Sequence, residues 1–83
     1  MKTAYGSREL ITCLTHLKYT PEPQVGSRHR KYRSPNHVEK GMMPFILVIQ
    51  GRSEYDPYWQ REYIKQIKRH GFSQTQIEEA MSR

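Results

Sequence analysis

The clearest strand of the chain is Phe45-Ile46-Leu47-Val48-Ile49. It is short, rich in β-branched residues and bounded by Pro44 and Gly51, which is typical of a strand. Successive side chains of a strand point to opposite faces, so a sheet with one wet face alternates apolar and polar residues. Every position here is apolar, and we therefore expect cover on both faces of this strand.

Two sources of that cover stay open. Phe45, Leu47 and Ile49 share one side of the strand, and the two residues between them share the other. Helices can cover one side. The other side is covered either by the chain itself, through the loop at residues 42–43, the N-terminal arm with Tyr5 or the last helix, or by another protein chain.

A strongly basic strand precedes it, Arg28-His29-Arg30-Lys31-Tyr32-Arg33. The dipeptide Gly26-Ser27 before this run favours a tight turn, because glycine readily adopts the positive φ that such turns need. Gln24-Val25 is then the expected first strand. The segment from Ser34 to Pro44 is punctuated by prolines, an asparagine and a glycine, which predicts a long connecting loop.

A helical pattern precedes the strands. Ser7 is its expected N-cap, and Leu10, Leu14 and Leu17 then recur at helical spacing. The helix should end before Pro21, because proline lacks an amide donor and restrains the residue before it.

Two further helices are expected after the strands. Asp56-Pro57 opens one as N-cap and first residue, and Gly71 ends it, with Phe72 packing back on the last turn. Ser73 and Gln76 have capping-box spacing and start a short third helix. The aromatic and aliphatic residues of the second helix, whose spacing favours core packing over stacking on nucleic-acid bases, are Tyr58, Trp59, Tyr63, Ile64 and Ile67.

These elements predict one α+β domain over residues 1–83, in the order α-β-β-β-α-α. Its three-stranded antiparallel sheet carries the helices on one face. With 83 residues, of which 35% are hydrophobic, the core must be thin. Chemistry is therefore expected on an exposed surface or in a shallow groove.

The charge balance points to a polyanionic partner. Fourteen Lys and Arg against eight Asp and Glu give a net charge of +6, which favours nucleic acid, an anionic membrane or an acidic protein. The longest apolar run, from Met42 to Ile49, is too short to span a bilayer, and residues 1–6 lack the apolar run of a signal peptide. One cysteine cannot form an internal disulfide, so a cytoplasmic location is expected.

The basic strand is the candidate site. His29, Lys31 and Arg33 share one face of it. An imidazole titrates near pH 6.5, so it can take a proton from an RNA 2′-hydroxyl, while neighbouring cations offset the charge that grows on phosphorus. No metal or other cofactor is needed. A lone histidine in a basic strand is, however, more often a simple phosphate or solvent contact, and the residues alone leave both readings open.

Other titratable residues are weaker candidates. His16 lies three residues after Cys13, but no second pair completes a tetrahedral metal site, and Cys13 is expected in the core. His37 falls in the loop. His70 lies near a helix C-terminus, where a cation is favoured in any case.

The sequence resembles the HicA family, the small toxins of HicA–HicB toxin–antitoxin pairs. The first helix contains Arg8-Glu9-Leu10-Ile11, and Gly26-Ser27-Arg28-His29 is similar to the family's G-S-x-H strand motif. An Ile- and Lys-rich helix then leads to Gly71-Phe72-Ser73 and to Ile77-Glu78-Glu79. The resemblance spans most of the chain in the family's order.

The resemblance implies a core like that of a double-stranded-RNA-binding domain, metal-independent cleavage of mRNA with His29 as the catalytic residue, and neutralisation by a HicB-like antitoxin protein. The predicted RNA-binding residues are Ser27, Arg28, Lys31 and Arg33. No membrane partner is expected.

The chain departs from the family at three places. Ile49-Gln50-Gly51-Arg52 stands where many members carry Pro-x-His, the loop from Ser34 to Pro44 is long, and Arg30 occupies a position that is often apolar. The aliphatic stem of Arg30 can pack while its head reaches water. Two other functions stay open, a non-catalytic RNA-binding module and a protein-interaction domain on the same fold.

Overall fold

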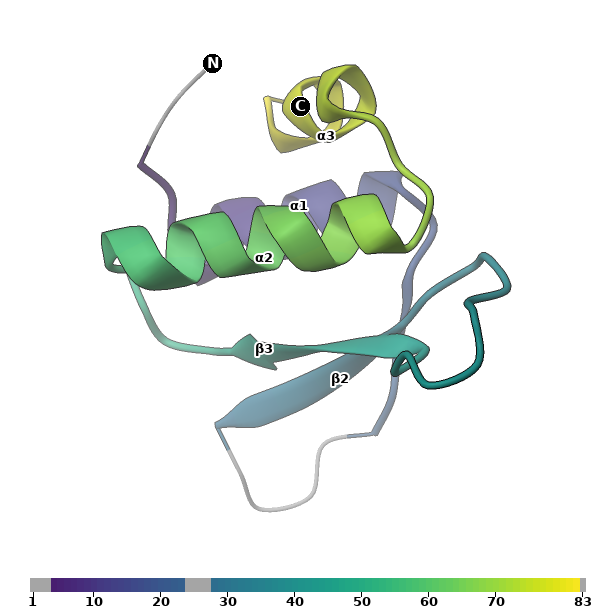
Figure 1. The fold of residues 1–83 in the computed structure, drawn as a ribbon. Helices are drawn as coiled ribbons and strands as arrows, with labels where there is room; N and C mark the ends of the chain where they lie inside the picture. The colour runs from purple at the N-terminus through teal and green to yellow at the C-terminus, as the bar shows by residue number, and fades with distance from the viewer. Residues whose placement is uncertain (1–3, 24–27, 83) are drawn as a thin grey trace.

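The computed structural model describes residues 4–23 and 28–82, and the predicted order of elements is confirmed (Figure 1). The elements are α1 (Ser7–His16), β1 (Thr20–Pro21), β2 (His29–Arg33), β3 (Phe45–Ile49), α2 (Pro57–Arg69) and α3 (Gln74–Met81). The strands form an open antiparallel sheet in the order β1-β2-β3, and all three helices lie on one side of it. No helix in the described ranges is long and apolar enough to cross a membrane.

The first strand differs from the prediction. Thr20 pairs with Arg33 and Pro21 with Tyr32, whereas the expected strand at 24–25 and the turn at 26–27 lie outside the described residues. Proline is tolerated here because β1 is an edge strand. The amide of Glu22 extends the pairing by donating to the Lys31 carbonyl at 2.9 Å.

The register of β2 and β3 confirms that alternate residues of each strand share one face of the sheet. Tyr32 pairs with Ile46 and Arg30 with Val48 on the inner face, where both aliphatic residues are fully buried. The outer row of β3 is more accessible, and Leu47 is 43% exposed.

The N-cap of α1 is Gly6 and not Ser7, so the predicted cap was wrong by one residue. The Glu9 carboxylate accepts the Gly6 amide proton at 2.7 Å and thereby closes the cap from within the helix. A Cβ on Gly6 would lie 2.2 Å from the Ser53 carbonyl oxygen, so a larger residue does not fit. Ser7 is buried instead, and its amide donates to the Arg52 carbonyl at 2.8 Å, which ties the loop after β3 to α1.

The caps of α2 and α3 are as predicted. Asp56 accepts the amide proton of Trp59 at 3.0 Å. Gly71 follows the end of α2 with φ +98°, a conformation that favours glycine. Ser73 and Gln76 then form reciprocal side-chain to backbone bonds of 3.1 and 2.8 Å.

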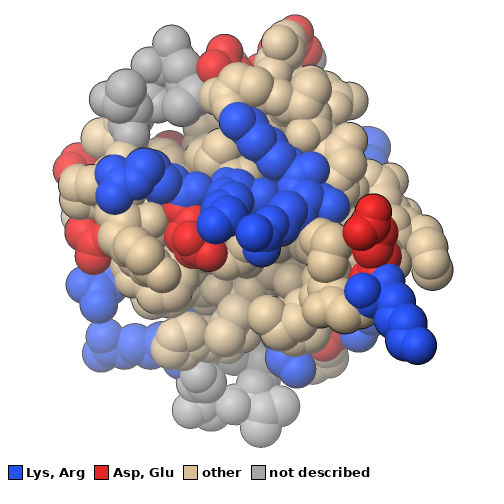
Figure 2. All heavy atoms as spheres, in the orientation of Figure 1, with Lys and Arg blue, Asp and Glu red and all other residues tan. Residues whose placement is uncertain are grey.

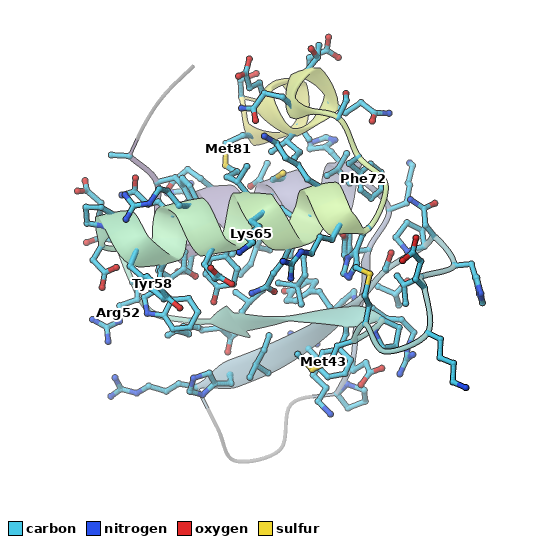
Figure 3. All side chains as sticks on the ribbon, viewed as in Figure 1. Met43, Arg52, Tyr58, Lys65, Phe72 and Met81 are labelled. Atoms are coloured by element: carbon cyan, nitrogen blue, oxygen red, sulfur yellow. The ribbon has the colours of Figure 1, made fainter. Side chains whose placement is uncertain are left out.

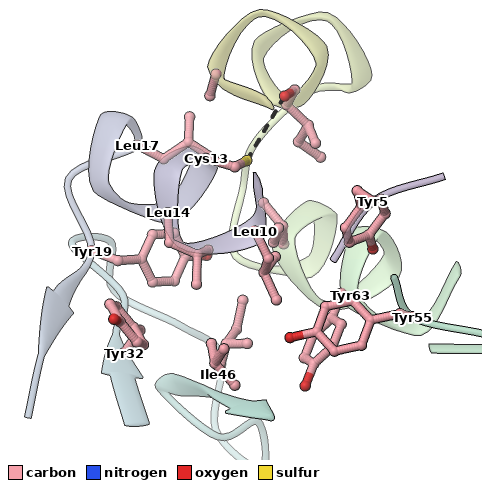
Figure 4. Packing of buried hydrophobic residues seen from close by; sticks show 14 residues of the cluster. Tyr5, Leu10, Cys13, Leu14, Leu17, Tyr19, Tyr32, Ile46, Tyr55 and Tyr63 are labelled. Carbon is pink, nitrogen blue, oxygen red and sulfur yellow. Dashed lines mark hydrogen bonds between the residues drawn. The ribbon is translucent and has the colours of Figure 1, made fainter. Parts of the chain in front are cut away.

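The core lies between the helices and the inner face of the sheet (Figure 4). The largest fully buried side chains are Leu10, Cys13, Leu14, Ile46, Val48, Tyr63, Ile67 and Ile77. Trp59 and Ile64, expected to be largely buried, are only partly so and pack at the edge of this cluster. The helix α3 covers α1, where the Cys13 thiol lies 3.8 Å from the Ile77 carbonyl oxygen.

Two tyrosine hydroxyls form hydrogen bonds with backbone groups at the unpaired edge of β3. The Tyr63 hydroxyl accepts the Ile49 amide proton at 3.0 Å and donates to the Leu47 carbonyl at 2.9 Å. The Tyr55 hydroxyl donates to the Ile49 carbonyl at 2.6 Å. These bonds replace the partner strand that an edge lacks, and they fix α2 against the sheet.

Candidate nucleic-acid interface

The outer face of β2 presents a row of basic side chains. His29, Lys31 and Arg33 are exposed, whereas Tyr32 is 4% exposed and faces the core. The predicted alternation is therefore confirmed. Arg28 precedes the strand and is also exposed, and Ser27 lies outside the described residues.

Arg30 lies on the inner face of the sheet, but its charged group still has a hydrogen-bond partner. Its side chain is partly buried, and its Nε donates to the Glu22 carbonyl at 2.9 Å. The aliphatic stem thus lies on the inner face while the charged head reaches the sheet edge. This geometry allows an arginine at an inward-facing position of the strand.

Arg33 is partly neutralised by a residue that the sequence reasoning did not single out. Its Nε donates to Glu22 Oε2 at 2.8 Å. Lys31 has a different neighbour, since its Nζ lies 4.7 Å from the centre of the Phe45 ring, a cation–π contact that leaves the charge accessible. Arg28 and Lys31 therefore offer more positive charge to a ligand than Arg33 does.

The start of β2 lies beside the end of β3. His29 pairs with Ile49, and the Gln50 amide donates to the Arg28 carbonyl at 2.9 Å. Gly51, with φ +80°, then turns the chain toward Arg52, which is exposed.

Figure 3 shows Arg52 and Tyr58 at the same end of the molecule, where β3 finishes and α2 begins. Tyr58 is 58% exposed and so does not belong to the core, contrary to the prediction. Both side chains therefore lie at the end of the sheet where β2 begins and β3 finishes. The antiparallel pairing of β2 with β3 is the signal that could have placed Arg52 near the start of β2.

The outer row of β3 keeps an exposed apolar surface. Tyr5 packs on the helix side, where its hydroxyl donates to the Gln60 carbonyl at 2.5 Å, and α3 packs on α1. Among the described residues, neither Tyr5 nor α3 supplies the cover that was considered for this row. Lys31 lies over Phe45, while Leu47 at 43% and Met43 at 65% stay exposed.

The other histidines and the cysteine are not part of this face. His70 is buried, and both of its ring nitrogens have a hydrogen-bond partner: Nδ1 lies 2.6 Å from the Tyr19 hydroxyl oxygen and Nε2 lies 3.1 Å from the Met43 carbonyl oxygen. Burial raises the pKa of the Cys13 thiol to about 12. His16 and His37 are exposed elsewhere. Across residues 4–23 and 28–82, no three His, Cys, Asp or Glu side chains cluster as metal ligands would.

Comparison of the chain with protein-family models, with curated proteins and with solved structures finds no match. The resemblance to HicA toxins therefore rests on the residues of the chain and on their order.

Proposed function

We propose that this protein is a metal-independent RNA-cleaving toxin of the HicA type, with the outer face of β2 as its RNA-binding surface. The observation that supports this most is the single exposed row of His29, Lys31 and Arg33 on the open side of the sheet, with Arg28 beside it. A titratable base next to cations is what cleavage through a 2′-hydroxyl requires.

In the proposed reaction, the neutral imidazole of His29 takes the proton of a ribose 2′-hydroxyl. The O2′–phosphorus bond forms and the phosphorus–O5′ bond breaks, which leaves a 2′,3′-cyclic phosphate and a 5′-hydroxyl. The imidazolium of His29 returns its proton to the departing O5′. Lys31 and Arg28 stabilise the extra negative charge on the phosphoryl oxygens in between.

The fold supports the proposal that RNA is the ligand, and the exposed apolar row of β3 supports the proposal of an antitoxin partner. The order α-β-β-β-α with helices on one side is that of double-stranded-RNA-binding domains, which read phosphates and 2′-hydroxyls. A HicB-like antitoxin that covers the outer face would bury Leu47 and block His29 together.

A non-catalytic RNA-binding module is the second candidate. It is favoured by the exposed Arg52, which stands where many HicA proteins carry Pro-x-His. An arginine there can bind a phosphate but supplies no titratable group near neutral pH.

A cleavage assay separates the two. Labelled single-stranded RNA is incubated with the wild type, His29→Ala and His37→Ala, always with a chelator present. His29→Ala should lower the cleavage rate about 100-fold or more, the scale of general acid–base catalysis. His37 is an exposed loop histidine, so His37→Ala should cleave like the wild type.

RNA affinity, measured in parallel, should change little in His29→Ala. Full cleavage by that variant would contradict the assignment of His29. Binding without cleavage by the wild type would favour the non-catalytic module.

A further inference from the structure

The helix α2 carries a second basic surface, separate from the candidate RNA face. Arg61, Lys65, Lys68 and Arg69 recur at helical spacing and are all exposed. Figure 2 shows Lys and Arg atoms gathered over α2. Within the described part of the chain, none of these four side chains forms an ion pair. Like charges at this spacing repel one another, so the row destabilises the free helix slightly.

These cations border a groove of about 720 Å³. Tyr5, Pro57 and Ile64 line it together with the basic residues, and Figure 3 shows Lys65 on α2. Ile64 is only partly buried by its own fold. The groove thus combines an apolar floor with a cationic rim, and its volume is that of a typical ligand site.

An RNA strand fits this groove poorly. Stacking of bases needs an exposed aromatic face, but Tyr5 is 3% exposed and its ring meets Tyr55 edge-on with centroids 5.8 Å apart. Phosphates would reach Lys65 and Lys68 and leave the apolar floor unfilled. Most residues that line the groove belong to α2, which lies on the helix side of the sheet (Figure 1), whereas His29 belongs to the exposed outer row of β2.

We infer that the groove is a docking site for an acidic amphipathic helix of a protein partner. Apolar side chains on one stripe of that helix fill the floor around Ile64. Carboxylates that flank the stripe meet Arg61, Lys65 and Lys68. The basic row spans about 12 Å at 1.5 Å per residue, the length of two helical turns, which matches helix-in-groove recognition. This inference does not rest on RNA cleavage, and a partner at α2 leaves the face with His29 open.

The probe is a labelled peptide of about 14 residues, four helical turns, with Leu at helical spacing and Glu at the flanking positions. Its control is the same peptide with Gln in place of every Glu. In a titration of the ¹⁵N-labelled full chain, the acidic peptide should shift the amides of residues 60–69 and leave those of residues 28–33 in place. Equal affinity for the two peptides, or shifts confined to residues 28–33, would overturn the proposal.

Two double variants with the same change in net charge test whether the cations beside the groove bind the peptide. Lys65→Glu with Lys68→Glu should weaken peptide binding about tenfold or more, as for several lost charge pairs. Arg8→Glu with Lys40→Glu changes the net charge equally at exposed sites away from the groove and should bind like the wild type. Equal weakening in both pairs, with both folded by circular dichroism, would show that net charge alone attracts the peptide.

Single-stranded RNA serves as the second ligand. RNA should shift the amide signals of residues 28–33. Shifts of the amide signals of residues 60–69 instead would make the groove an RNA-binding surface and overturn the proposed docking site. Cleavage of RNA by the Lys65→Glu, Lys68→Glu variant should equal that of the wild type. A chain that cleaves no RNA but binds the acidic peptide would contradict the proposed function alone.

Discussion

The outer face of β2 and the groove on α2 are both basic, but different neighbours surround their charges. On β2 the exposed cations lie on a strand beside the imidazole of His29. On α2 they border an apolar floor, and none of the described residues that line the groove is a histidine. Basic side chains therefore gather on at least two surfaces of the protein. What lies between the charges, an imidazole or an aliphatic floor, indicates which polyanion each surface fits.

A tyrosine of α2 links the helix that carries the groove to the sheet that carries His29. Tyr63 lies on α2, yet its hydroxyl bonds to the backbone of β3 at Leu47 and Ile49, the strand beside His29. We therefore expect the two surfaces to bind different ligands, and we expect the loss of the Tyr63 hydrogen bonds to destabilise the fold as a whole.

The largest expected effect concerns the salt dependence of RNA binding. Replacing Arg28, Lys31 and Arg33 with Ala should weaken binding across all sequences and flatten the plot of log affinity against log salt, by about 0.7 for each lost phosphate contact to single strands. Arg33→Ala alone should change the slope least, because Glu22 already pairs with it. Filter binding over a range of salt concentrations measures this.

The Lys65→Glu, Lys68→Glu variant is the control for that experiment, and its slope should match the wild type. The two surfaces would not be distinct in RNA binding if the triple Ala variant kept the slope of the wild type. The same conclusion would follow if the slope flattened equally in the triple Ala variant and in the Lys65→Glu, Lys68→Glu variant.

A smaller effect is expected from Tyr63→Phe, which removes the bonds that link α2 to the edge of β3. Leaving the Ile49 amide and the Leu47 carbonyl unpaired should lower the free energy of unfolding by about 1–3 kcal/mol. Hydrogen exchange of the Ile49 amide should accelerate. Tyr58→Phe, at an exposed position, is the matched control and should have little effect. Equal stability of the two variants in urea denaturation would show that the edge does not need these bonds.

The smallest expected effect is a dependence of stability on pH, which is absent near neutral pH and appears only in alkaline solution. Burial raises the pKa of Cys13 from 9.0 to about 12, and it raises the pKa of Tyr5, Tyr19 and Tyr55 above 10.0. The unfolded chain therefore releases these protons at a lower pH than the folded one, so the free energy of unfolding should fall as pH rises above about 9. Urea denaturation between neutral pH and pH 10.5 or so, beyond the ordinary pKa of Tyr, checks this. Constant or rising stability over that range would contradict the burial of these groups.

The elements with strong local signals could be predicted from the sequence. The apolar strand Phe45–Ile49, the start of α2 at Asp56-Pro57 and the capping box of Ser73 depend on neighbouring residues only, and all three are confirmed. The N-cap of α1 was misplaced because Gly6 is selected by a distant contact, the close approach of Ser53. Local propensity favours Ser7 there, and tertiary structure overrides it.

The same distinction applies to the site. Alternation along β2 predicted the exposed row with His29, because it needs only the period of a strand. Three features depend on segments that are distant in sequence: the pairing of Glu22 with Arg33, the position of Arg52 beside the start of β2, and the floor beneath Lys65. No local pattern carries that information.

The chemical ends of the RNA products test the central claim most directly. The substrate is an oligodeoxynucleotide with a single ribonucleotide, incubated with the wild type and with His29→Ala in the presence of a chelator, and the products are identified by mass spectrometry. We predict that the wild type cuts only after the ribonucleotide and leaves a 2′,3′-cyclic phosphate and a 5′-hydroxyl, and that His29→Ala leaves the strand intact. Cleavage at deoxy positions, a 5′-phosphate end or unchanged products with His29→Ala would contradict the account.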